Sequence, residues 1–185
     1  MGEQKEKTLS SQRIFTGKIL TLYHDQVELP NGNTASRELV RHHGAVCIVP
    51  LTQDEQVVME KQYRYPVDQV IWEIPAGKLE PGEKDPLLAA KRELAEETGA
   101  IAEEWLDMGL YYPACAYCDE GIRMYMAKGL TFGERHLDQD EFLDVELVPL
   151  REMVEAVLAG KIPDLKTQAA LLRAWLILHP GELAK

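Results

Sequence analysis

Cysteine is scarce in this sequence: the 185 residues include only three, an odd number, and Cys47 lies inside an apolar run. A disulfide framework is therefore not expected, and a reducing cytoplasm is the predicted location. Long apolar runs are absent as well, since none approaches the roughly 18 residues that a membrane span requires. The N-terminal MGEQKEKTLSSQR is polar and lacks the apolar core of a signal peptide. We therefore expect a cytoplasmic protein that has no membrane partner.

Positive charge is also in short supply. Lys and Arg number 20 against 31 Asp and Glu, so the formal net charge is −11. An acidic chain without a Lys/Arg stripe does not attract nucleic-acid backbones, which excludes nucleic acid as a partner. If the protein acts on an anionic substrate, it needs bound cations to do so. The apolar fraction of 45% is that of an ordinary globular protein, and the length fits one main domain with a small appendage.

Turn and periodicity signals predict a β-rich N-terminal segment. Asn31-Gly32 is a strong hairpin turn between two extended runs, which places a small antiparallel β unit in residues 1–43. Two or three strands are marginally stable alone, so this unit must pack on the rest of the chain or on a second subunit. Further strands are predicted, in chain order, at 44–51, 56–62, 70–74, 105–112, 122–129 and 143–149.

Three helices are predicted among these strands. The first covers 86–98, with Asp85 as its N-cap and Gly99 as its left-handed C-cap. The second covers 150–159, and the third begins behind Asp164. The apolar face of the third helix is expected to carry Leu165, Ala169, Leu172 and Leu176. Strands and helices are mixed without strict alternation, which predicts an α/β or α+β class in which helices pack on a mixed sheet.

The first of these helices carries three carboxylates on one face. Glu93, Glu96 and Glu97 have the spacing i, i+3 and i+4, which puts their Cβ atoms roughly 5–6 Å apart. The like charges repel one another; Arg92 offsets part of the repulsion through Glu96, and Mg²⁺, which prefers oxygen ligands, would offset more. The glycine-rich loop before the helix can bring the backbone near Ala76 to the same face, where a carbonyl is a further oxygen ligand. The alternative is a solvated acidic face with one salt bridge.

The segment GKLEPGEKDPLLAAKRELAEETGA resembles the Nudix hydrolase box, G-x5-E-x7-R-E-U-x-E-E-x-G-U, in which U is an aliphatic residue. The matching residues are Gly77, Glu83, Arg92, Glu93, Leu94, Glu96, Glu97 and Gly99. Two features depart from the pattern. Eight residues, not seven, separate Glu83 from Arg92, which leaves open whether Glu83 or Glu80 reaches the metal site. The final U is the small residue Ala100.

Flanking motifs extend the resemblance to the ADP-ribose pyrophosphatase branch of this family, over roughly residues 14–150. They are GKILTLYHDQVELPNG, SRELVRHHGAV, EKQYRYPV, IWEIPAGKLEPGE and LDQDEFLDVELVPL. The resemblance implies a Nudix-type α/β/α sandwich with a mixed sheet, plus a small N-terminal antiparallel β unit. It also implies a homodimer, in which an N-terminal unit of residues 1–43 is shared or swapped between subunits and residues 44–185 form the Nudix catalytic domain.

The reaction implied by this branch is Mg²⁺-dependent hydrolysis of the pyrophosphate bond of ADP-ribose to AMP and ribose 5-phosphate, with Mn²⁺ as an alternative cofactor. The number of ions stays open. The resemblance assigns the metal to the carbonyl of Ala76 and the carboxylates of Glu93 and Glu97. Glu96 assists in binding and catalysis, and Arg92 orients the helix carboxylates.

The catalytic base implied by the resemblance is Glu141, in the acidic loop before the strand at 143–149. Asp138, Asp140 and Glu134 are neighbouring alternatives, and a solvated loop without a catalytic role is another. Candidate substrate contacts are Arg37, Arg64, Glu73, Lys78 and Glu120. The fixed fork of arginine suits phosphate. For Arg37, the alternative is a salt bridge on the strand face with Glu38 or Glu28.

One loop departs from the branch and bears on specificity. Ala114, Cys115 and Ala116 stand where a Ser-Pro-Gly loop is usual, so another sugar nucleotide such as GDP-mannose is an alternative substrate. Cys115 and Cys118 form a lone C-x-x-C, which we assign to loop packing rather than to a metal or redox site. A non-catalytic sensor of ADP-ribose or a sugar nucleotide is the alternative of another class, although sensors usually lose box glutamates. Cleavage of oxidised nucleoside triphosphates fits the box but not the flanking motifs.

Overall fold

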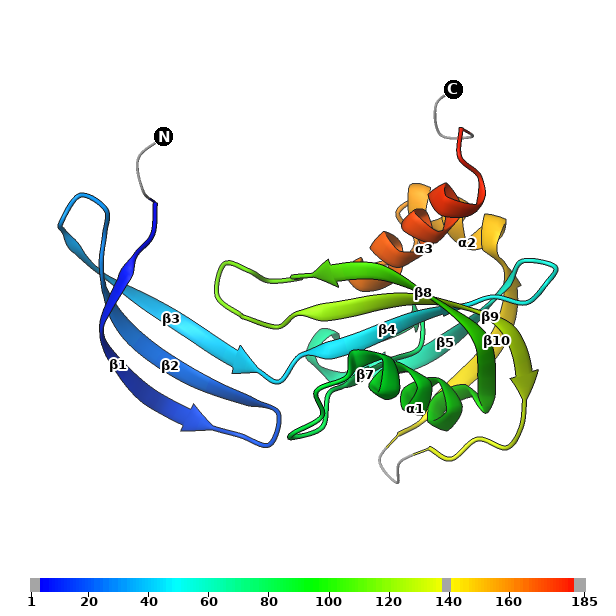
Figure 1. Ribbon diagram of the computed structural model, residues 1–185, viewed down its shortest axis with the longest axis horizontal. Helices are drawn as coiled ribbons and strands as arrows, with labels where there is room; N and C mark the ends of the chain where they lie inside the picture. Colours follow the sequence, from blue (N-terminus) through cyan, green and yellow to red (C-terminus); the bar gives the residue numbers. More distant parts are fainter. Residues whose placement is uncertain (1–3, 138–140, 182–185) are drawn as a thin grey trace. The chain divides into compact units, whose positions relative to one another are not determined.

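A computed structural model describes residues 4–137 and 141–181 of the chain (Figure 1). The chain divides into two compact units, which are described separately. Unit 1 comprises Met1–Gly44 and Tyr112–Gly121, and unit 2 comprises Ala45–Tyr111 and Ile122–Lys185. Within the described ranges, none of the helices is long and apolar enough to cross a membrane.

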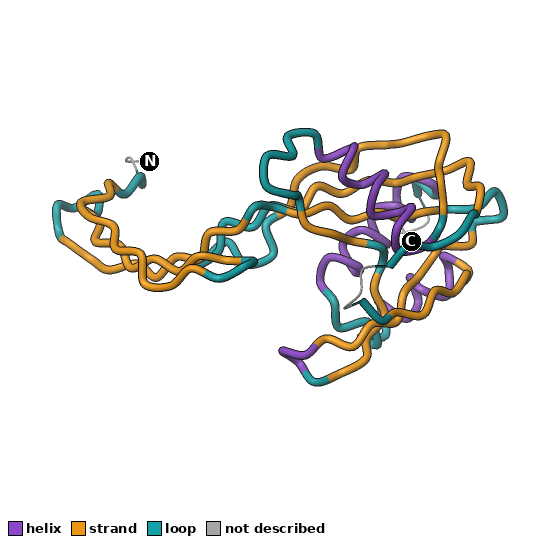
Figure 2. Tube along the Cα trace, turned by 90° about the horizontal axis from the view of Figure 1, so that it is seen from below, coloured by secondary structure: helices purple, strands orange, loops and turns teal. Residues whose placement is uncertain are grey.

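Unit 1 is built on a three-stranded antiparallel sheet, whose strands run side by side in Figure 2. The strands, in spatial order, are β1 (Lys7–Thr16), β2 (Leu20–Glu28) and β3 (Thr34–His42). The predicted hairpin is confirmed: Gly32 has a φ of 84°, and Asn31 Oδ1 accepts a hydrogen bond from the Asn33 N–H. Every residue of β1 is exposed, so this sheet buries little apolar surface of its own.

Within the described residues, unit 2 contains two sheets and three α-helices. One sheet has the order β7-β4-β9-β8, in which β4 and β9 are parallel and the other neighbours are antiparallel. The second sheet is antiparallel, in the order β10-β5-β6. The strands are β4 (Ala45–Pro50), β5 (Gln56–Arg64), β6 (Gln69–Glu73), β7 (Ala76–Lys78), β8 (Ala100–Tyr111), β9 (Ile122–Phe132) and β10 (Leu143–Pro149). The helices are α1 (Pro86–Thr98), α2 (Leu150–Leu158), α3 (Leu165–Leu178) and the short 3-10 helix η1 (Tyr65–Val67).

Helices cover both faces of the four-stranded sheet, as the buried strand β4 shows. Val46 and Ile48 pack in the cluster that includes apolar residues of α1. Cys47 and Val49 pack in the cluster that includes residues of α2 and α3. Figure 1 shows α1 and the α2–α3 pair on opposite sides of this sheet. A strand buried on both faces reads as a continuous apolar run, and the predicted α/β/α sandwich with a mixed sheet is confirmed.

The buried face of α3 differs from the predicted one. The residues that it buries are Thr167, Ala170, Leu171, Ala174 and Trp175. Of the predicted face, Ala169 and Leu172 are partly buried and pack against the core, whereas Leu165 and Leu176 are 58% and 45% exposed, so the prediction is wrong for these two. Apolar residues occupy most positions of this helix, so its pattern did not single out one face. The buried face also carries a polar contact: the Thr167 hydroxyl accepts a hydrogen bond from the Ile74 N–H at 3.1 Å.

Candidate active site

The two caps of α1 fix where the helix begins and ends. Asp85 Oδ1 accepts the Leu87 N–H at 3.0 Å, Pro86 follows as the first helical residue, and Gly99 ends the helix with a φ of 71°. These are the caps that the sequence predicted. With this register Glu93 and Glu97 are buried, at 9% and 4% exposed. A solvated acidic face, the alternative considered from the sequence, does not describe two carboxylates at this depth.

The backbone of β7 lies directly against these two carboxylates. The Ala76 N–H donates to Glu97 Oε2 at 3.0 Å. A Cβ atom added to Gly77 would lie 1.8 Å from Glu93 Cδ. The close approach requires glycine at this position, because any side chain would displace the Glu93 carboxylate. The predicted meeting of the loop backbone with the acidic face is therefore present in the structure.

Arg92 connects the box residues to one another. Its guanidinium donates to Glu93 Oε1 at 2.9 Å and to Glu96 Oε2 at 3.0 Å. It also donates to Glu83 Oε2 and to the Lys78 carbonyl, both at 3.3 Å. Burial lowers the pKa of Arg92, but Glu93, Glu96 and Glu83 together raise it above its usual value. Despite the extra residue in the loop, Glu83 thus joins the box network.

Negative charge in this region is only partly balanced. Burial raises the pKa of Glu93, which Glu96 and Glu141 raise further while Arg92 lowers it. The pKa of Glu97 is raised well above its usual value by burial, then by Glu60, Glu93 and Glu141. The cause is a set of carboxylates gathered at low dielectric with too few cations among them.

Glu60, a member of this set, was missed in the sequence. It lies on β5, is 2% exposed, and burial followed by the nearby Glu73 raises its pKa to about 8. Its Oε1 has no hydrogen-bond partner among the described residues. A signal was available: Glu60 directly follows the apolar run Val57–Met59, in a strand whose centre is expected to be buried.

Glu73 is held by two cations on the neighbouring strand and helix. Arg64 donates to it through Nε and Nη2, the latter at 2.8 Å, and Lys166 of α3 pairs with the same carboxylate. Burial raises the pKa of Glu73, but Arg64 and Lys166 overcome that effect and leave it lowered. Lys166 also pairs with Asp164 at 3.0 Å. The sequence singled out Arg64 and Glu73 but did not identify Lys166 as their partner.

The candidate bases can be distinguished by the effect of their charge on the pKa values of the buried carboxylates. The charge of Glu141 raises the pKa of Glu60, Glu93 and Glu97, so Glu141 lies near all three. Glu134 is exposed. The other two alternatives, Asp138 and Asp140, lie outside the described residues. Of the described candidates, Glu141 is the one whose charge acts on the box carboxylates Glu93 and Glu97.

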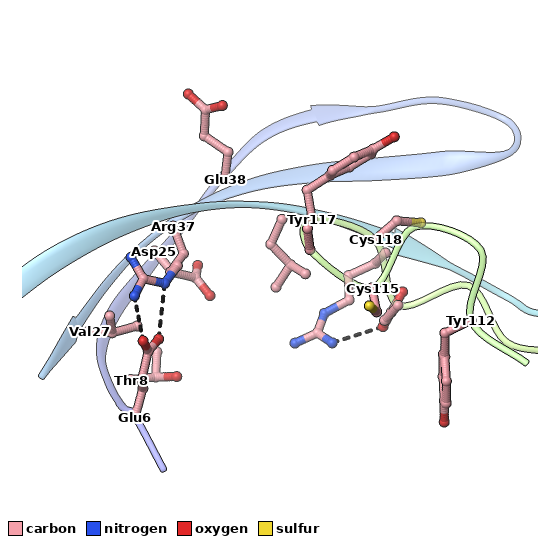
Figure 3. A pocket seen from close by; sticks show the side chains of 14 residues that line it. Glu6, Thr8, Asp25, Val27, Arg37, Glu38, Tyr112, Cys115, Tyr117 and Cys118 are labelled. Carbon is pink, nitrogen blue, oxygen red and sulfur yellow. Dashed lines mark hydrogen bonds and ion pairs between the residues drawn. The ribbon is translucent and has the colours of Figure 1, made fainter. Parts of the chain in front are cut away.

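The remaining substrate candidates, Arg37 and Glu120, belong to unit 1. Arg37 lines a pocket of about 490 Å³ and pairs with Glu6, as Figure 3 shows; its Nε lies 3.0 Å from Glu6 Oε2. The alternative ion pair with Glu38 or Glu28 is therefore corrected to Glu6, which approaches from the segment before β1.

The loop 112–121 is attached to the edge strand β3. The Val40 N–H donates to the Tyr117 carbonyl at 2.7 Å, and the Glu120 carboxylate lies 3.5 Å from His42 Nδ1. Cys118 Sγ accepts the Glu120 N–H at 3.4 Å, and Cys115 is exposed. Both cysteines are free thiols and line the pocket. These contacts are those of loop packing.

The donor set near α1 suits a hard divalent cation, although its side chains are not preassembled. Among the described residues, no three His, Cys, Asp or Glu side chains stand in an arrangement that would hold a metal ion. The carboxylates present are hard oxygen donors, their charge is in excess, and one buried Glu60 oxygen lacks a partner. Mg²⁺ and Mn²⁺ prefer such ligands, so the chemistry of the donors fits the implied metal.

Comparison with known families decides the affiliation of the chain. A family model described as the NUDIX domain matches residues 41–171. The chain belongs to the Nudix family. A second model, described as the nucleoside diphosphate sugar hydrolase N-terminal domain, matches residues 6–40 of this Nudix hydrolase.

Several relatives resemble this Nudix hydrolase over most of their length. A protein of Bacillus methanolicus named methanol dehydrogenase activator is 46% identical over 171 residues, covering 90% of this chain and 91% of the relative. An ADP-ribose pyrophosphatase of Bacillus subtilis is 40% identical, covering 92% and 93%. One of Mycobacterium tuberculosis is 37% identical, covering 88% and 79%. A solved structure described as an ADP compounds hydrolase has a TM-score of 0.80 at 24% identity, covering 94% and 95%, and shows the same fold.

Proposed function

We propose that this Nudix hydrolase splits the pyrophosphate bond of ADP-ribose, giving AMP and ribose 5-phosphate, with Mg²⁺ as its cofactor and Mn²⁺ as a substitute. The observation that carries the proposal is the packing of two buried box carboxylates, Glu93 and Glu97, against the backbone at Ala76 and Gly77. The relatives named ADP-ribose pyrophosphatase, at 37% and 40% identity, support this substrate. All three box glutamates are present, which argues against a non-catalytic sensor.

The metal would be held by the Ala76 carbonyl and the carboxylates of Glu93 and Glu97, with Glu96 assisting. When bound, a divalent cation neutralises charge on the phosphates and activates the attacking water. Arg92 already grips Glu93 and Glu96, at 2.9 and 3.0 Å. The role of Arg92 is therefore to fix the orientation of both carboxylates, and its positive charge is paired with carboxylates of the protein rather than with substrate.

Glu141 is the proposed base, which takes the proton of the attacking water. Its charge acts on Glu60, Glu93 and Glu97, which supports a place beside the box helix. Glu141 also lies two residues before β10, which pairs with β5 from Leu143 onward.

Five residues are proposed to contact the substrate: Arg37, Arg64, Glu73, Lys78 and Glu120. Arg64 uses Nε and Nη2 on Glu73, so its second terminal nitrogen would reach a phosphate while Glu73 holds the fork in place. Lys78 has an exposed side chain next to the box, and its carbonyl already receives Arg92. Arg37 lines a pocket together with the rings of Tyr112 and Tyr117, a setting suited to a nucleoside diphosphate.

The proposed assembly is a cytoplasmic homodimer in which residues 1–43 are shared or swapped and residues 44–185 form the catalytic domain. Support comes from the N-terminal sheet, where large apolar side chains of β1 lie open to solvent: Leu9, Ile14 and Phe15 are each about half exposed, from 47% to 56%. A three-stranded sheet with its apolar side chains uncovered needs a partner surface. Sedimentation of the purified protein would give its mass in solution.

A substrate panel tests the proposed reaction. ADP-ribose, GDP-mannose and other sugar nucleotides would be incubated with Mg²⁺ or with EDTA, and the products separated by chromatography. We expect AMP and ribose 5-phosphate from ADP-ribose in the Mg²⁺ arm alone. Faster cleavage of GDP-mannose than of ADP-ribose would make GDP-mannose the preferred substrate. Tight binding of ADP-ribose without cleavage would indicate a sensor.

A second candidate function follows from the 46% identity to the protein named methanol dehydrogenase activator. The same purified protein, added to a methanol dehydrogenase assay, should raise the turnover if it acts as that relative's name states. The Glu97→Gln variant in the same assay shows whether activation needs the box carboxylates.

A further inference from the structure

Glu60 and Glu73 lie opposite each other on neighbouring strands but differ in their hydrogen bonding. The two residues are register partners on β5 and β6, and each is 2% exposed. Glu73 is fully engaged by Arg64 and Lys166. Glu60 Oε1 has no hydrogen-bond partner within residues 4–137 and 141–181. Buried polar atoms in folded proteins are nearly always paired, so this oxygen calls for a donor that the described chain does not provide.

The position of Glu60 indicates where that donor would lie. Of the carboxylates that act on Glu97, Glu60 has the largest effect. Glu97 in turn accepts a hydrogen bond from the Ala76 N–H of β7 at 3.0 Å. The unpaired acceptor therefore belongs to β5, and its carboxylate acts on Glu97, one of the proposed cation ligands.

We propose that Glu60 is a positioning residue of the divalent-cation site, where its Oε1 accepts a hydrogen bond from a water of the cation's hydration shell. The inference rests on the proposed function, since it presumes that Glu93 and Glu97 bind the cation. Mg²⁺ dehydrates reluctantly and keeps several waters when bound to a few carboxylates. Those waters are donors, and a buried acceptor beside Glu97 orients them. Outer partners of this kind are typically worth about 10–100-fold in metal affinity.

The test is Mn²⁺ binding to the folded protein without substrate, by isothermal titration, for wild type and Glu60→Gln. Glutamine keeps the size of the side chain but removes its charge. We expect Glu60→Gln to bind Mn²⁺ about 10–100-fold more weakly, with a melting temperature in EDTA no lower than that of wild type. The matched control is Glu146→Gln, which removes one charge from the adjacent strand β10, where Glu146 is 48% exposed and paired with Lys61. The control should bind Mn²⁺ like wild type.

The outcomes separate this inference from the function on which it rests. If wild type binds Mn²⁺ and folded Glu60→Gln binds it equally well, the role of Glu60 is overturned and the proposed function stands. If wild type itself binds no Mn²⁺, both are overturned. Should Glu60→Gln fail to fold, Glu60→Asp replaces it: this variant keeps the charge but withdraws the oxygens by one methylene, so a partial loss of affinity is expected. Wild-type affinity in Glu60→Asp would likewise overturn the inference.

Discussion

Replacing Gly77 by alanine adds one methyl group at the closest contact of the site. The new Cβ would lie 1.8 Å from Glu93 Cδ and 1.9 Å from its Oε1. Real Cβ contacts are about 3.5–4.0 Å, so the carboxylate or the β7 backbone must move by well over an ångström. Gly77 does not have a positive φ, so alanine can adopt its backbone conformation. The expected effect therefore comes from the contact with Glu93 alone.

The size of the effect follows from what Glu93 can do in response. Its carboxylate is held at 2.9 Å by Arg92, so moving it breaks that pairing and displaces a proposed metal ligand. A misplacement of about 1 Å at a catalytic group can lower turnover about 10²-fold. Overpacking of a buried site typically destabilises a protein by about 1–3 kcal/mol. We therefore expect Gly77→Ala to fold, to melt at a lower temperature and to lose about 10²-fold in kcat.

Gly133→Ala is the matched control. Its added Cβ would meet only the Gly99 carbonyl oxygen, at an ordinary 3.7 Å, and Gly133 also lacks a positive φ. The assay is Mg²⁺-dependent release of AMP from ADP-ribose, with thermal denaturation of each variant alongside. Gly133→Ala should match wild type in kcat. Wild-type kcat in Gly77→Ala would refute the packing of Glu93 on this backbone as a requirement of the site.

Three further changes test other parts of the molecule. Glu141→Gln should lower kcat by roughly 10² or more, as loss of a general base does, with little change in KM; near-normal turnover would remove Glu141 from that role. Burial raises the pKa of Glu60 from 4.5 to about 8, so the cation-free folded protein holds this proton more tightly than the unfolded chain does. Its unfolding free energy should therefore fall as pH rises between those values, and Glu60→Gln should flatten the curve obtained by urea titration; an unchanged slope in the variant would contradict this. Asp85→Ala removes the N-cap of α1 and should cost about 1 kcal/mol, seen as a lower urea midpoint, whereas an unshifted midpoint would show that the cap is dispensable.

The sequence predicted most elements because their signals are local. Asp85, Pro86 and Gly99 bound α1 by capping chemistry, and Asn31-Gly32 fixes the first hairpin through backbone conformation. The strand at 143–149 was predicted to the residue. The face of α3 could not be predicted in this way, because it depends on contacts with distant segments, such as the hydrogen bond between Thr167 and Ile74, 93 positions apart.

The same limit applies to the candidate site. Residues on one helix, such as Glu93 and Glu97, could be grouped from their spacing, and the motif then supplied their chemistry. Glu60 and Lys166 reach the site from a strand and from the last helix. Strand pairing and helix packing bring them together, and neither is visible in the spacing of one segment. Arg37 illustrates the same point in unit 1, since its partner Glu6 lies on a segment 31 residues away.

The most direct test of the metal-dependent pyrophosphatase is ADP-ribose hydrolysis by wild type and Glu97→Gln across a Mg²⁺ titration. If the buried box carboxylates hold the cation, wild type releases AMP and ribose 5-phosphate only with Mg²⁺. Glu97→Gln should then lose more than the roughly 10–100-fold that removal of an outer metal partner costs. Equal Mg²⁺-dependent turnover in the two proteins would show that the cation is bound elsewhere and would contradict the proposed site.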